Sequence, residues 1–300
     1  MYSMNRTRLV GAALFVNFYV RRIFRIYPLS VLAVLTAVAL HLDSGVNGIP
    51  GLSRVASIPG WRIFSNLFLV QNIIKPGSII NVLWSLPYEV QMYIFLPFLY
   101  IWVRRTRVPV KALCILWVLS VLGATARDHL LVHTTPGSLA WRLSILQYVP
   151  NFVPGIIAFA LPAIPKIKSF VWPLFVLTLV CIFSLFPNGR AGWALCLILG
   201  FAIPFFAEIR TGWLRKISNR IATYSYGIYL SHQFCIWLIA DPLAPLQLWI
   251  KMVILIASLI AVPIVLYHFV EKPMIKVGVE LADKWQALTA DLTAARQSNA

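Results

Sequence analysis

Glu89 is the residue whose position in this chain most directly suggests chemistry. It stands in the segment VLWSLPYEVQMY, inside an otherwise apolar stretch, where an ionisable side chain is costly and is a functional hypothesis by default. Ser85, Glu89 and Tyr93 repeat at four-residue intervals, so they share one face of a helix. A carboxylate there could accept a proton from a hydroxyl, or orient a His that does so. The alternative is a helix-start carboxylate that the helix dipole favours and water solvates.

Arg22 and Arg25 are the second candidates, in the segment FYVRRIFRIYPL. They stand three residues apart and therefore lie on the same side of a helix. Their guanidinium groups suit a phosphate-rich ligand such as coenzyme A, because each planar fork donates paired hydrogen bonds to phosphate oxygens. The alternative is a basic cluster that anchors the chain to anionic lipid on the cytoplasmic side.

His232, in the segment YSYGIYLSHQ, is the third candidate. It lies in the middle of an apolar run, where a neutral imidazole could move protons or hydrogen-bond to a neighbouring helix. His268 and Glu271 stand together at the end of the last apolar run, and we expect a local polar contact there. Neither the four cysteines nor the histidines have the spacing of a metal site, so no metal is expected.

The elements that must position these residues are membrane-spanning helices. Sixty per cent of the 300 residues are hydrophobic and 12% are charged, about half of what a soluble domain carries. The net charge of +17 would suit a nucleic-acid binder, but the basic residues stand in short clusters between apolar runs, as in the cytoplasmic loops of membrane proteins. We expect an all-α, polytopic integral membrane helix bundle and no nucleic-acid partner.

Runs of about 20 apolar residues, the length that crosses a bilayer, predict about eight transmembrane helices. The stretch Trp61–Ile74 is shorter and more polar, and we place it at the outer interface, because a ninth span would put the basic clusters on opposite sides. The eight expected spans are Ile23–Leu42, Leu83–Val103, Pro109–Ala126, Leu139–Ala163, Ser169–Phe186, Ala191–Ala207, Ile221–Ala240 and Leu246–Val270.

The basic clusters also predict the orientation of the chain. Most of the 26 lysines and arginines fall in segments that eight spans place on one side, which we expect to be cytoplasmic. Residues 1–22 are then a cytoplasmic N-terminal segment with a basic cluster, 23–270 are the transmembrane bundle, and 271–300 are a cytoplasmic C-terminal tail. The polar end of this tail, Val279–Ala300, is predicted to be a fraying surface helix.

Four segments, taken in order, resemble the membrane-bound acyltransferase-3 family. FYVRRIFRIYPLSVL is similar to its RRxxRIYPL segment, and VLWSLPYEVQMYIFLPFL to its WSLSxExQFYLLLP segment. YSYGIYLSHQ is similar to its SYGIYLxHQ segment, and LYHFVEKPMIKVG to its closing Y-x-x-IE-[RK]-P-x-x-x-x-G segment. Each motif is loose alone, but their order and spacing agree over residues 18–278, nearly the whole chain.

The resemblance implies an acyltransferase in the bacterial inner membrane. Such a protein would move an acyl group, in particular acetyl, from cytoplasmic acyl-CoA to a hydroxyl of an extracytoplasmic glycan. Acyl-CoA would be a donor substrate rather than a permanently bound cofactor, and the other partners would be the lipid bilayer and a cell-surface glycan or lipid-linked sugar. Arg22 and Arg25 would lie on the coenzyme A side, Glu89 on the acceptor side, and His232 in a supporting role.

The chain departs from the family pattern at its start. Family members begin with two further spans, the first of which carries an essential His, whereas the first His here is His41. Because activating a hydroxyl needs a base with a pKa near neutrality, we expect residues 1–300 alone to insert in the membrane without catalysing transfer. Two alternatives stay open: a degenerate, inactive fragment of the family, and a non-catalytic transporter of lipid-linked glycan. The transporter would need paired broken helices from an internal repeat, and the sequence has no such pair.

Overall fold

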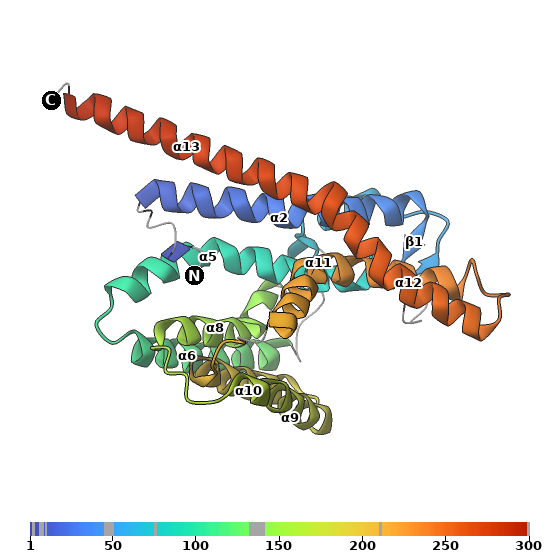
Figure 1. The fold of residues 1–300 in the computed structure, drawn as a ribbon, viewed down its shortest axis with the longest axis horizontal. Coiled ribbons are helices and arrows are strands. Elements are labelled where there is room, and N and C mark those ends of the chain that lie inside the picture. Colours follow the sequence, from blue (N-terminus) through green and yellow to red (C-terminus); the bar gives the residue numbers. More distant parts are fainter. Residues whose placement is uncertain are drawn as a thin grey trace. The chain divides into compact units, whose positions relative to one another are not determined.

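The structure, a computed structural model, describes residues 1, 4–5, 9, 11–44, 51–74, 77–131, 142–209 and 212–298, and it is almost entirely helical (Figure 1). The α-helices are α2 Gly11–Ala39, α3 Gly60–Leu67, α4 Gln71–Ile74, α5 Leu86–Arg105, α6 Pro109–Leu131, α8 Val149–Ala160, α9 Trp172–Leu185, α10 Gly189–Ala202, α11 Gly212–Ala240, α12 Leu248–Leu266 and α13 Lys272–Ser298. The shorter helical turns are η1 Asn81–Trp84, η2 Ser144–Gln147, η3 Ser169–Val171, η4 Ile203–Phe205 and the π turn η5 Tyr267–Glu271. The described strands, β1 Leu42–Asp43 and β2 Ser53–Arg54, pair antiparallel. The all-α prediction is confirmed.

Each of the eight predicted apolar runs contains a helix. Within the described residues, three helices are long and apolar enough to cross a membrane: Gly11–Ala39, Pro109–Leu130 and the continuous helix Leu248–Leu288, with mean hydropathies of 1.5, 1.8 and 2.5. In lipid, backbone N–H and C=O groups must be satisfied internally, which is why such apolar runs fold as helices. These helices fit a multi-pass membrane protein.

The other predicted spans are shorter or more polar. Val149–Ala160, Ser169–Leu185 and Gly189–Phe205 are apolar but short. The 12 residues of α8 rise only about 18 Å, against a hydrocarbon core of roughly 30 Å. The run predicted to begin at 139 starts among residues 132–141, which lie outside the described part of the chain. The helices α5 and α11 are long, but polar residues in each lower their hydropathy.

Helix α2, which contains most of the first predicted span, begins earlier than the sequence predicts. The first span is expected to begin at Ile23, but α2 begins at Gly11 and continues through Arg22, Arg25 and Pro28. Residues 11–20 are largely apolar and contain no proline that would break the helix, so it extends back through them. Long arginine side chains can extend from such a helix toward water. The two arginines therefore lie inside a helix rather than before one.

The polar stretch 61–74 is broken into two short helices. Between α3 and α4, Leu69 has a φ of 54°, in the left-handed region that interrupts a helix. The 8 residues of α3 rise only about 12 Å. This stretch is too short to cross a bilayer, as the sequence predicts.

The predicted helix in the tail is present and longer than expected. It reaches Ser298 as part of α13, which begins at Lys272. The π turn η5 joins α12 to α13 without a break, so the tail continues directly from the last apolar span.

The chain divides into two compact units, each of which is described by itself. Unit 1 comprises Met1–Arg6 and Gln91–Ile217, and unit 2 comprises Thr7–Val90 and Ser218–Ala300. The division runs through α5 and α11. The domain borders at 22 and 270, which were drawn from charge and hydropathy, stay predictions.

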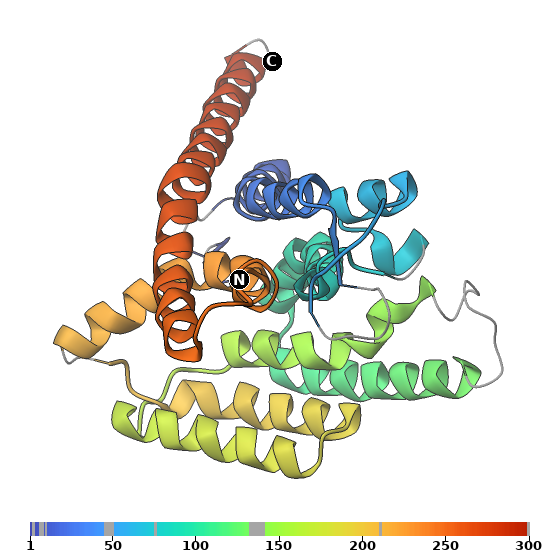
Figure 2. The same ribbon diagram turned by 90° about the vertical axis from the view of Figure 1, so that its right-hand side faces the viewer.

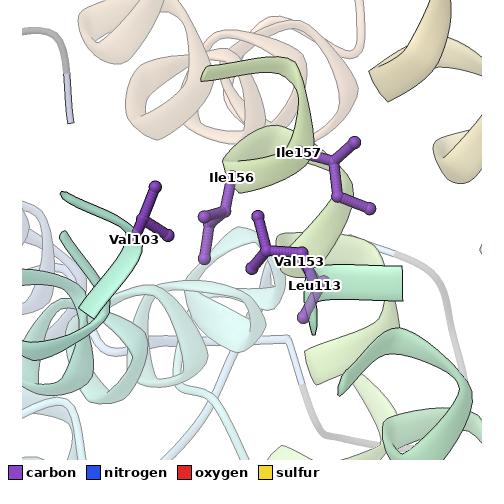
Figure 3. Packing of buried hydrophobic residues seen from close by; sticks show 5 residues of the cluster. All are labelled: Val103, Leu113, Val153, Ile156 and Ile157. Atoms are coloured by element: carbon purple, nitrogen blue, oxygen red, sulfur yellow. The ribbon is translucent and has the colours of Figure 1, made fainter. Parts of the chain in front are cut away.

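Unit 1 is held together by an apolar core around α8. The core residues come from α5, α6 and α8 and are at most 6% exposed (Figure 3): Val103, Leu113, Val153, Ile156 and Ile157. Helix α8 also packs against α10, where a Cβ on Gly200 would lie 2.5 Å from the carbonyl oxygen of Pro154. No side chain fits in that space, so the close packing of these two helices requires glycine.

Unit 2 is organised by the long contact between α2 and α13, which run alongside each other in Figure 1; Figure 2 shows the same two helices after a 90° turn. A Cβ on Gly278 of α13 would lie 2.6 Å from the Cβ of Phe24 on α2, so the helices approach closely at this glycine. One turn further along, Arg21 donates a hydrogen bond to Asp283 at 2.9 Å. This packing brings the basic residues of α2 beside α13.

Candidate active site

Glu89 lies half-buried in the first turn of α5, directly after η1. The helix can begin here because Pro87 stands in its first turn, where a missing N–H is harmless, and because the carbonyl of Ser85 accepts the backbone N–H of Glu89 at 3.1 Å. The carboxylate is favoured at this end of the helix by the helix dipole.

Tyr226 of α11 lies near two carboxylates in unit 2. It interacts electrostatically with Glu89 and with Glu271, and its hydroxyl donates a hydrogen bond to the Ile26 carbonyl of α2 at 2.7 Å. Glu271 interacts in turn with Arg25. Glu89, Tyr226, Glu271 and Arg25 therefore form a series of neighbouring polar groups, which we call the polar series.

Glu271 is the most deeply buried member of the polar series. It ends the π turn η5, is only 3% exposed, and its Oε2 has no hydrogen-bond partner among the described residues. A π turn inserts one extra residue into a helix and is frequent at functional sites. A buried carboxylate in a long apolar helix is itself costly, so this residue also demands a functional explanation.

His232 lies on α11, two residues beyond Leu230. Its Nδ1 is 3.2 Å from the carbonyl oxygen of Ile228, one turn earlier in the same helix. Because a carbonyl can only accept a hydrogen bond, Nδ1 carries the proton of the neutral imidazole. Nε2 then keeps its lone pair, which is the form that a general base requires.

Tyr229 connects the surroundings of His232 to the start of α5. Its ring centroid lies 6.3 Å from that of His232, and it interacts electrostatically with Glu89. Its hydroxyl donates a hydrogen bond to the Val82 carbonyl and lies 2.8 Å from the hydroxyl of Ser85. Since Tyr229 has one proton, Ser85 is the donor in the second contact. The structure thus brings Glu89 and His232 into one region of unit 2 through Tyr229.

Arg22 and Arg25 have different neighbours, although the sequence pairs them. The guanidinium of the half-buried Arg22 lies over the ring of Phe18, 5.5 Å from its centroid. Arg25 is exposed and interacts with Glu271. Arg21, which the sequence does not single out, shares the α13 side with Arg25, because residues four apart lie on one helix face.

Tyr226, Tyr229 and Glu271 are the site residues that sequence reasoning missed. The two tyrosines stand three and six residues before His232, a spacing that places all three on one side of a helix and could have identified them. The expected contact of Glu271 with His268 is replaced by its interaction with Arg25, whereas Nδ1 of His268 lies 2.9 Å from the Ile264 carbonyl. Only the packing of α13 on α2 reveals that partner.

The described residues contain no group of three or more His, Cys, Asp and Glu side chains that could hold a metal ion. The arrangement offers other chemistry: a carboxylate at a helix start, an imidazole in a base-competent tautomer and the exposed guanidinium group of Arg25. These features can accept a proton and bind an anionic ligand.

Apolar helices that carry such polar groups define an integral membrane protein with a polar interior. A family model described as an acyltransferase domain matches residues 9–268, most of the chain, so the chain belongs to the acyltransferase-3 family and is a membrane acyltransferase. The search of curated proteins found no match, and neither did the search of solved structures.

Proposed function

We propose that this protein moves an acyl group, in particular acetyl, from cytoplasmic acyl-CoA to a hydroxyl of an extracytoplasmic glycan. It would do so in a bacterial inner membrane, with its C-terminus in the cytoplasm. The observation that carries the proposal is the polar series Glu89, Tyr226, Glu271 and Arg25 within unit 2. Ionisable groups on membrane helices are costly and mark the binding or movement of charge, which acyl transfer from an anionic donor requires.

Arg22 and Arg25 would bind the phosphates of the donor. The exposure of Arg25 supports this role, because its guanidinium is accessible to a ligand. The stacking of Arg22 on Phe18 supports it too, since a stacked guanidinium holds its hydrogen-bond fork in one orientation. Acyl-CoA would bind and leave as a substrate.

Glu89 and His232 would act on the acceptor hydroxyl. As the hydroxyl oxygen attacks the thioester carbonyl carbon, Nε2 of His232 would take its proton, and Glu89 would orient the hydroxyl or the imidazole. His232 would then supply the base that the family pattern places in its first span, and residues 1–300 alone would be active, in place of the inactivity expected from the sequence. The carbon–sulfur bond then breaks, and the thiolate of coenzyme A leaves and takes up a proton. The acyl group ends as an ester on the sugar oxygen.

The test compares membranes from cells that express the natural gene with membranes from a deletion strain, each supplied with acetyl-labelled acetyl-CoA. We expect gene-dependent labelling of cell-surface glycan and release of an equal amount of free coenzyme A. Glu89→Gln should lower both, whereas Glu208→Gln, at an exposed carboxylate of unit 1, should not. Movement of glycan without release of coenzyme A would instead indicate a transporter and contradict the proposal.

A further inference from the structure

A polar pocket of about 310 Å³ lies in unit 2, just before and at the start of α5. Its volume is at the lower end of the roughly 300–1,000 Å³ of small-molecule sites. It is about ten times the roughly 30 Å³ that one water molecule occupies in the liquid. The walls combine amide and hydroxyl groups with two aromatic rings and include Ser44, Gln71, Asn72, Asn81, Trp84 and Tyr88.

Gln71, which lines this pocket, carries an unsatisfied hydrogen-bond acceptor. The side chain is 3% exposed, and its Nε2 donates a hydrogen bond to the Leu83 carbonyl at 3.1 Å. Its Oε1 is buried and has no hydrogen-bond partner among the described residues. A buried acceptor without a donor is unfavourable, and rotation of the Gln71 side chain toward the pocket would let a bound hydroxyl supply the missing donor.

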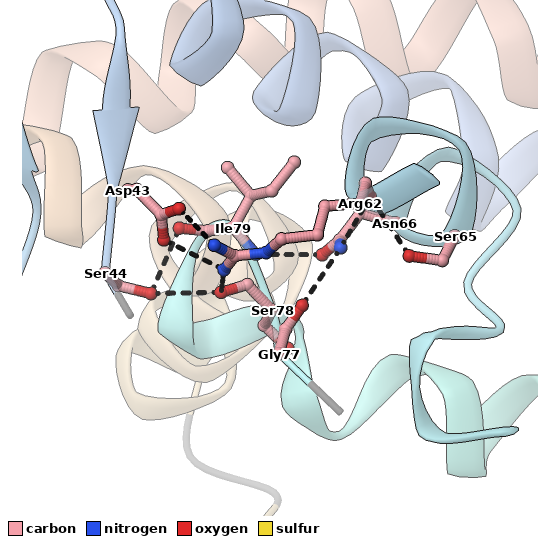
Figure 4. A network of polar contacts seen from close by, with 8 residues as sticks. All are labelled: Asp43, Ser44, Arg62, Ser65, Asn66, Gly77, Ser78 and Ile79. Carbon is pink, nitrogen blue, oxygen red and sulfur yellow. Dashed lines mark hydrogen bonds and ion pairs between the residues drawn. The ribbon is translucent and has the colours of Figure 1, made fainter. Parts of the chain in front are cut away.

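The pocket rests on a buried ion pair. Arg62 of α3 donates two hydrogen bonds to Asp43, which is 2% exposed, and a third to the Ser78 carbonyl at 3.3 Å (Figure 4). A bidentate guanidinium–carboxylate contact fixes both orientation and distance. The segment that follows α2 is thereby fixed to α3 and to the loop before α5.

Asn66 and Ser44 fix the same loop a second time. Oδ1 of Asn66 accepts the Ile79 N–H at 3.0 Å, and its Nδ2 donates to the Gly77 carbonyl at 3.2 Å (Figure 4). The hydroxyl of Ser44 donates to the Ile79 carbonyl at 3.0 Å. The pocket wall is therefore ordered before any ligand arrives, which lowers the entropic cost of binding.

The chemistry of the walls selects an uncharged ligand. The described side chains that line the pocket are neutral, and Arg62, which lies next to Gly77 of the wall, is neutralised by Asp43. An anion such as a coenzyme A phosphate would find no excess positive charge here. A phosphate ligand is therefore disfavoured relative to one that offers several hydroxyl groups.

Two aromatic rings, of Trp84 and Tyr88, belong to the wall, and that of Trp84 is exposed. Trp84 is 48% exposed, and its ring centroid lies 6.5 Å from that of Tyr88. Sugars present hydroxyl groups at their edges and C–H groups on their faces. Amide and hydroxyl side chains can bind the edges, while an exposed indole can pack against a C–H face. The combination fits a pyranose better than it fits a purely apolar or a charged molecule.

We propose that this pocket binds one neutral sugar unit of the acceptor glycan, a hexose or deoxyhexose. Gln71 and Asn81 bind its hydroxyl groups, and Trp84 packs against its C–H face. The inference rests on the proposed function, because it assigns the acceptor of that reaction to a site. Tyr88 of the wall directly precedes Glu89, so the pocket adjoins the first turn of α5, which carries the carboxylate of the candidate active site.

Sugar binding can be measured without catalysis. The intact protein is reconstituted in phospholipid nanodiscs, because maltoside detergents would themselves present sugar. Saturation-transfer NMR is recorded with the methyl glycosides of glucose, galactose, mannose and rhamnose, and with glycerophosphoethanolamine as a lipid-headgroup probe. We expect at least one glycoside, and not the headgroup probe, to receive saturation from the protein.

Three variants locate the signal. Trp84→Ala and Asn81→Ala should each weaken glycoside binding about tenfold or more, as truncation of a central contact does. Trp102→Ala removes a similarly exposed tryptophan from unit 1 and should leave binding unchanged. The proposal is overturned if no glycoside binds, if the headgroup probe binds instead, or if the Trp84 and Asn81 variants bind as the unaltered protein does.

An activity measurement separates this inference from the proposed function. In the acetyl-transfer assay, Trp84→Ala should raise the acceptor concentration for half-maximal rate about tenfold, with less effect on the maximal rate. Unchanged acceptor dependence with intact transfer would refute the pocket and leave the acyltransferase proposal standing. Glycoside binding without any gene-dependent acetyl transfer would refute the acyltransferase proposal and leave the pocket standing.

Discussion

The two units differ most in what they bury. Among the described residues, unit 1 buries the polar side chains of Arg127 and Ser144 and otherwise packs an apolar core around α8. The Arg127 guanidinium donates hydrogen bonds to the carboxylate of the adjacent Asp128 and, at 3.2 Å, to the side-chain oxygen of Gln147. The described part of unit 2 buries nine polar side chains: Asn17, Ser30, Asp43, Ser65, Asn66, Gln71, Asn72, Ser231 and Glu271.

This difference indicates that unit 1 contributes mainly to stability, whereas unit 2 also holds the groups that could act on ligands. A membrane protein gains little from burying polar groups for their own sake, because they must be removed from water and paired. Unit 2 nevertheless leaves the buried Oε1 of Gln71 and Oε2 of Glu271 without hydrogen-bond partners among its described residues. We infer that changes in the core of unit 1 act on stability, whereas changes in unit 2 act on ligands as well.

The largest effect is expected at the ion pair beneath the polar pocket. Arg62→Met removes the bidentate partner of the buried Asp43, and breaking a buried pair costs about 3–5 kcal/mol of unfolding free energy. Arg54→Met breaks the exposed pair with Asp241 in the same unit and should cost roughly 0–1 kcal/mol. Unfolding in mixed micelles measures both. Equal losses would show that burial does not distinguish the two pairs.

The arginines of α2 test whether changes in unit 2 act on ligand binding. Replacing Arg22 and Arg25 by Gln removes charge-assisted contacts worth about 1.5–3 kcal/mol, so acyl-CoA affinity should fall roughly ten- to a hundredfold. Lys at these positions should rescue little, because an ammonium lacks the planar fork. Replacing Arg104 and Arg105, exposed on α5 in unit 1, should leave acyl-CoA kinetics unchanged. If both double variants behave alike, Arg22 and Arg25 are lipid anchors.

Gly200 tests whether changes in the packing of unit 1 act on stability alone. An added methyl group would lie 2.5 Å from the Pro154 carbonyl, so Gly200→Ala should force α10 away from α8 and cost about 1–3 kcal/mol of stability. Gly192→Ala, on the same helix, places its methyl group 3.6 Å from the Phe183 ring, an ordinary contact, and should be nearly neutral. The fraction of the Gly200→Ala protein that still folds should bind substrate with unchanged affinity. A large rise in the Michaelis constant would show that unit 1 shapes the site.

The sequence is most informative where the signal is local. Glu89 can be placed at a helix start because Pro87 and the following apolar run are adjacent in the chain. The all-α fold follows from apolar runs for the same reason. The start of α2 is harder to place, because a charge cluster such as Arg21 and Arg22 can lie inside a membrane helix when long side chains reach water.

The contacts that make the site are not local, and hydropathy cannot supply them. Arg62 donates a hydrogen bond to Asp43, 19 residues away in the sequence, and Arg21 donates one to Asp283, 262 residues away. The position of Glu271 in the chain predicts a contact with His268, yet the π turn and the close approach at Gly278 bring it to Arg25. Spacing shows which side chains share a helix face, but not which helix lies opposite.

Substitution of Glu271 is predicted to have the smallest effect, and it should raise acyl-CoA affinity, whereas substitution of the arginines should lower it. If Arg25 binds a donor phosphate, the Glu271 carboxylate competes with that phosphate for the same guanidinium. Glu271→Gln keeps the shape and removes the charge, so acyl-CoA should bind more tightly. Because Arg25 is exposed and its charge is screened by solvent, the gain should be limited to about two- to fivefold.

The sign of this effect decides between two roles for Arg25. Were Arg25 a structural lock between α2 and α13, Glu271→Gln would loosen that contact and weaken acyl-CoA use. Asp283→Asn is the matched control: it removes the charge that Arg21 contacts on the same helix, at an exposed pair, and should leave acyl-CoA affinity unchanged. Acyl-CoA titrations of the three proteins at low and high salt make the comparison. Arg25 is identified as a phosphate ligand if only Glu271→Gln binds acyl-CoA more tightly and if this gain in affinity shrinks as the salt concentration rises. Salt has this effect because it screens both the Glu271–Arg25 attraction and the attraction between Arg25 and the phosphate.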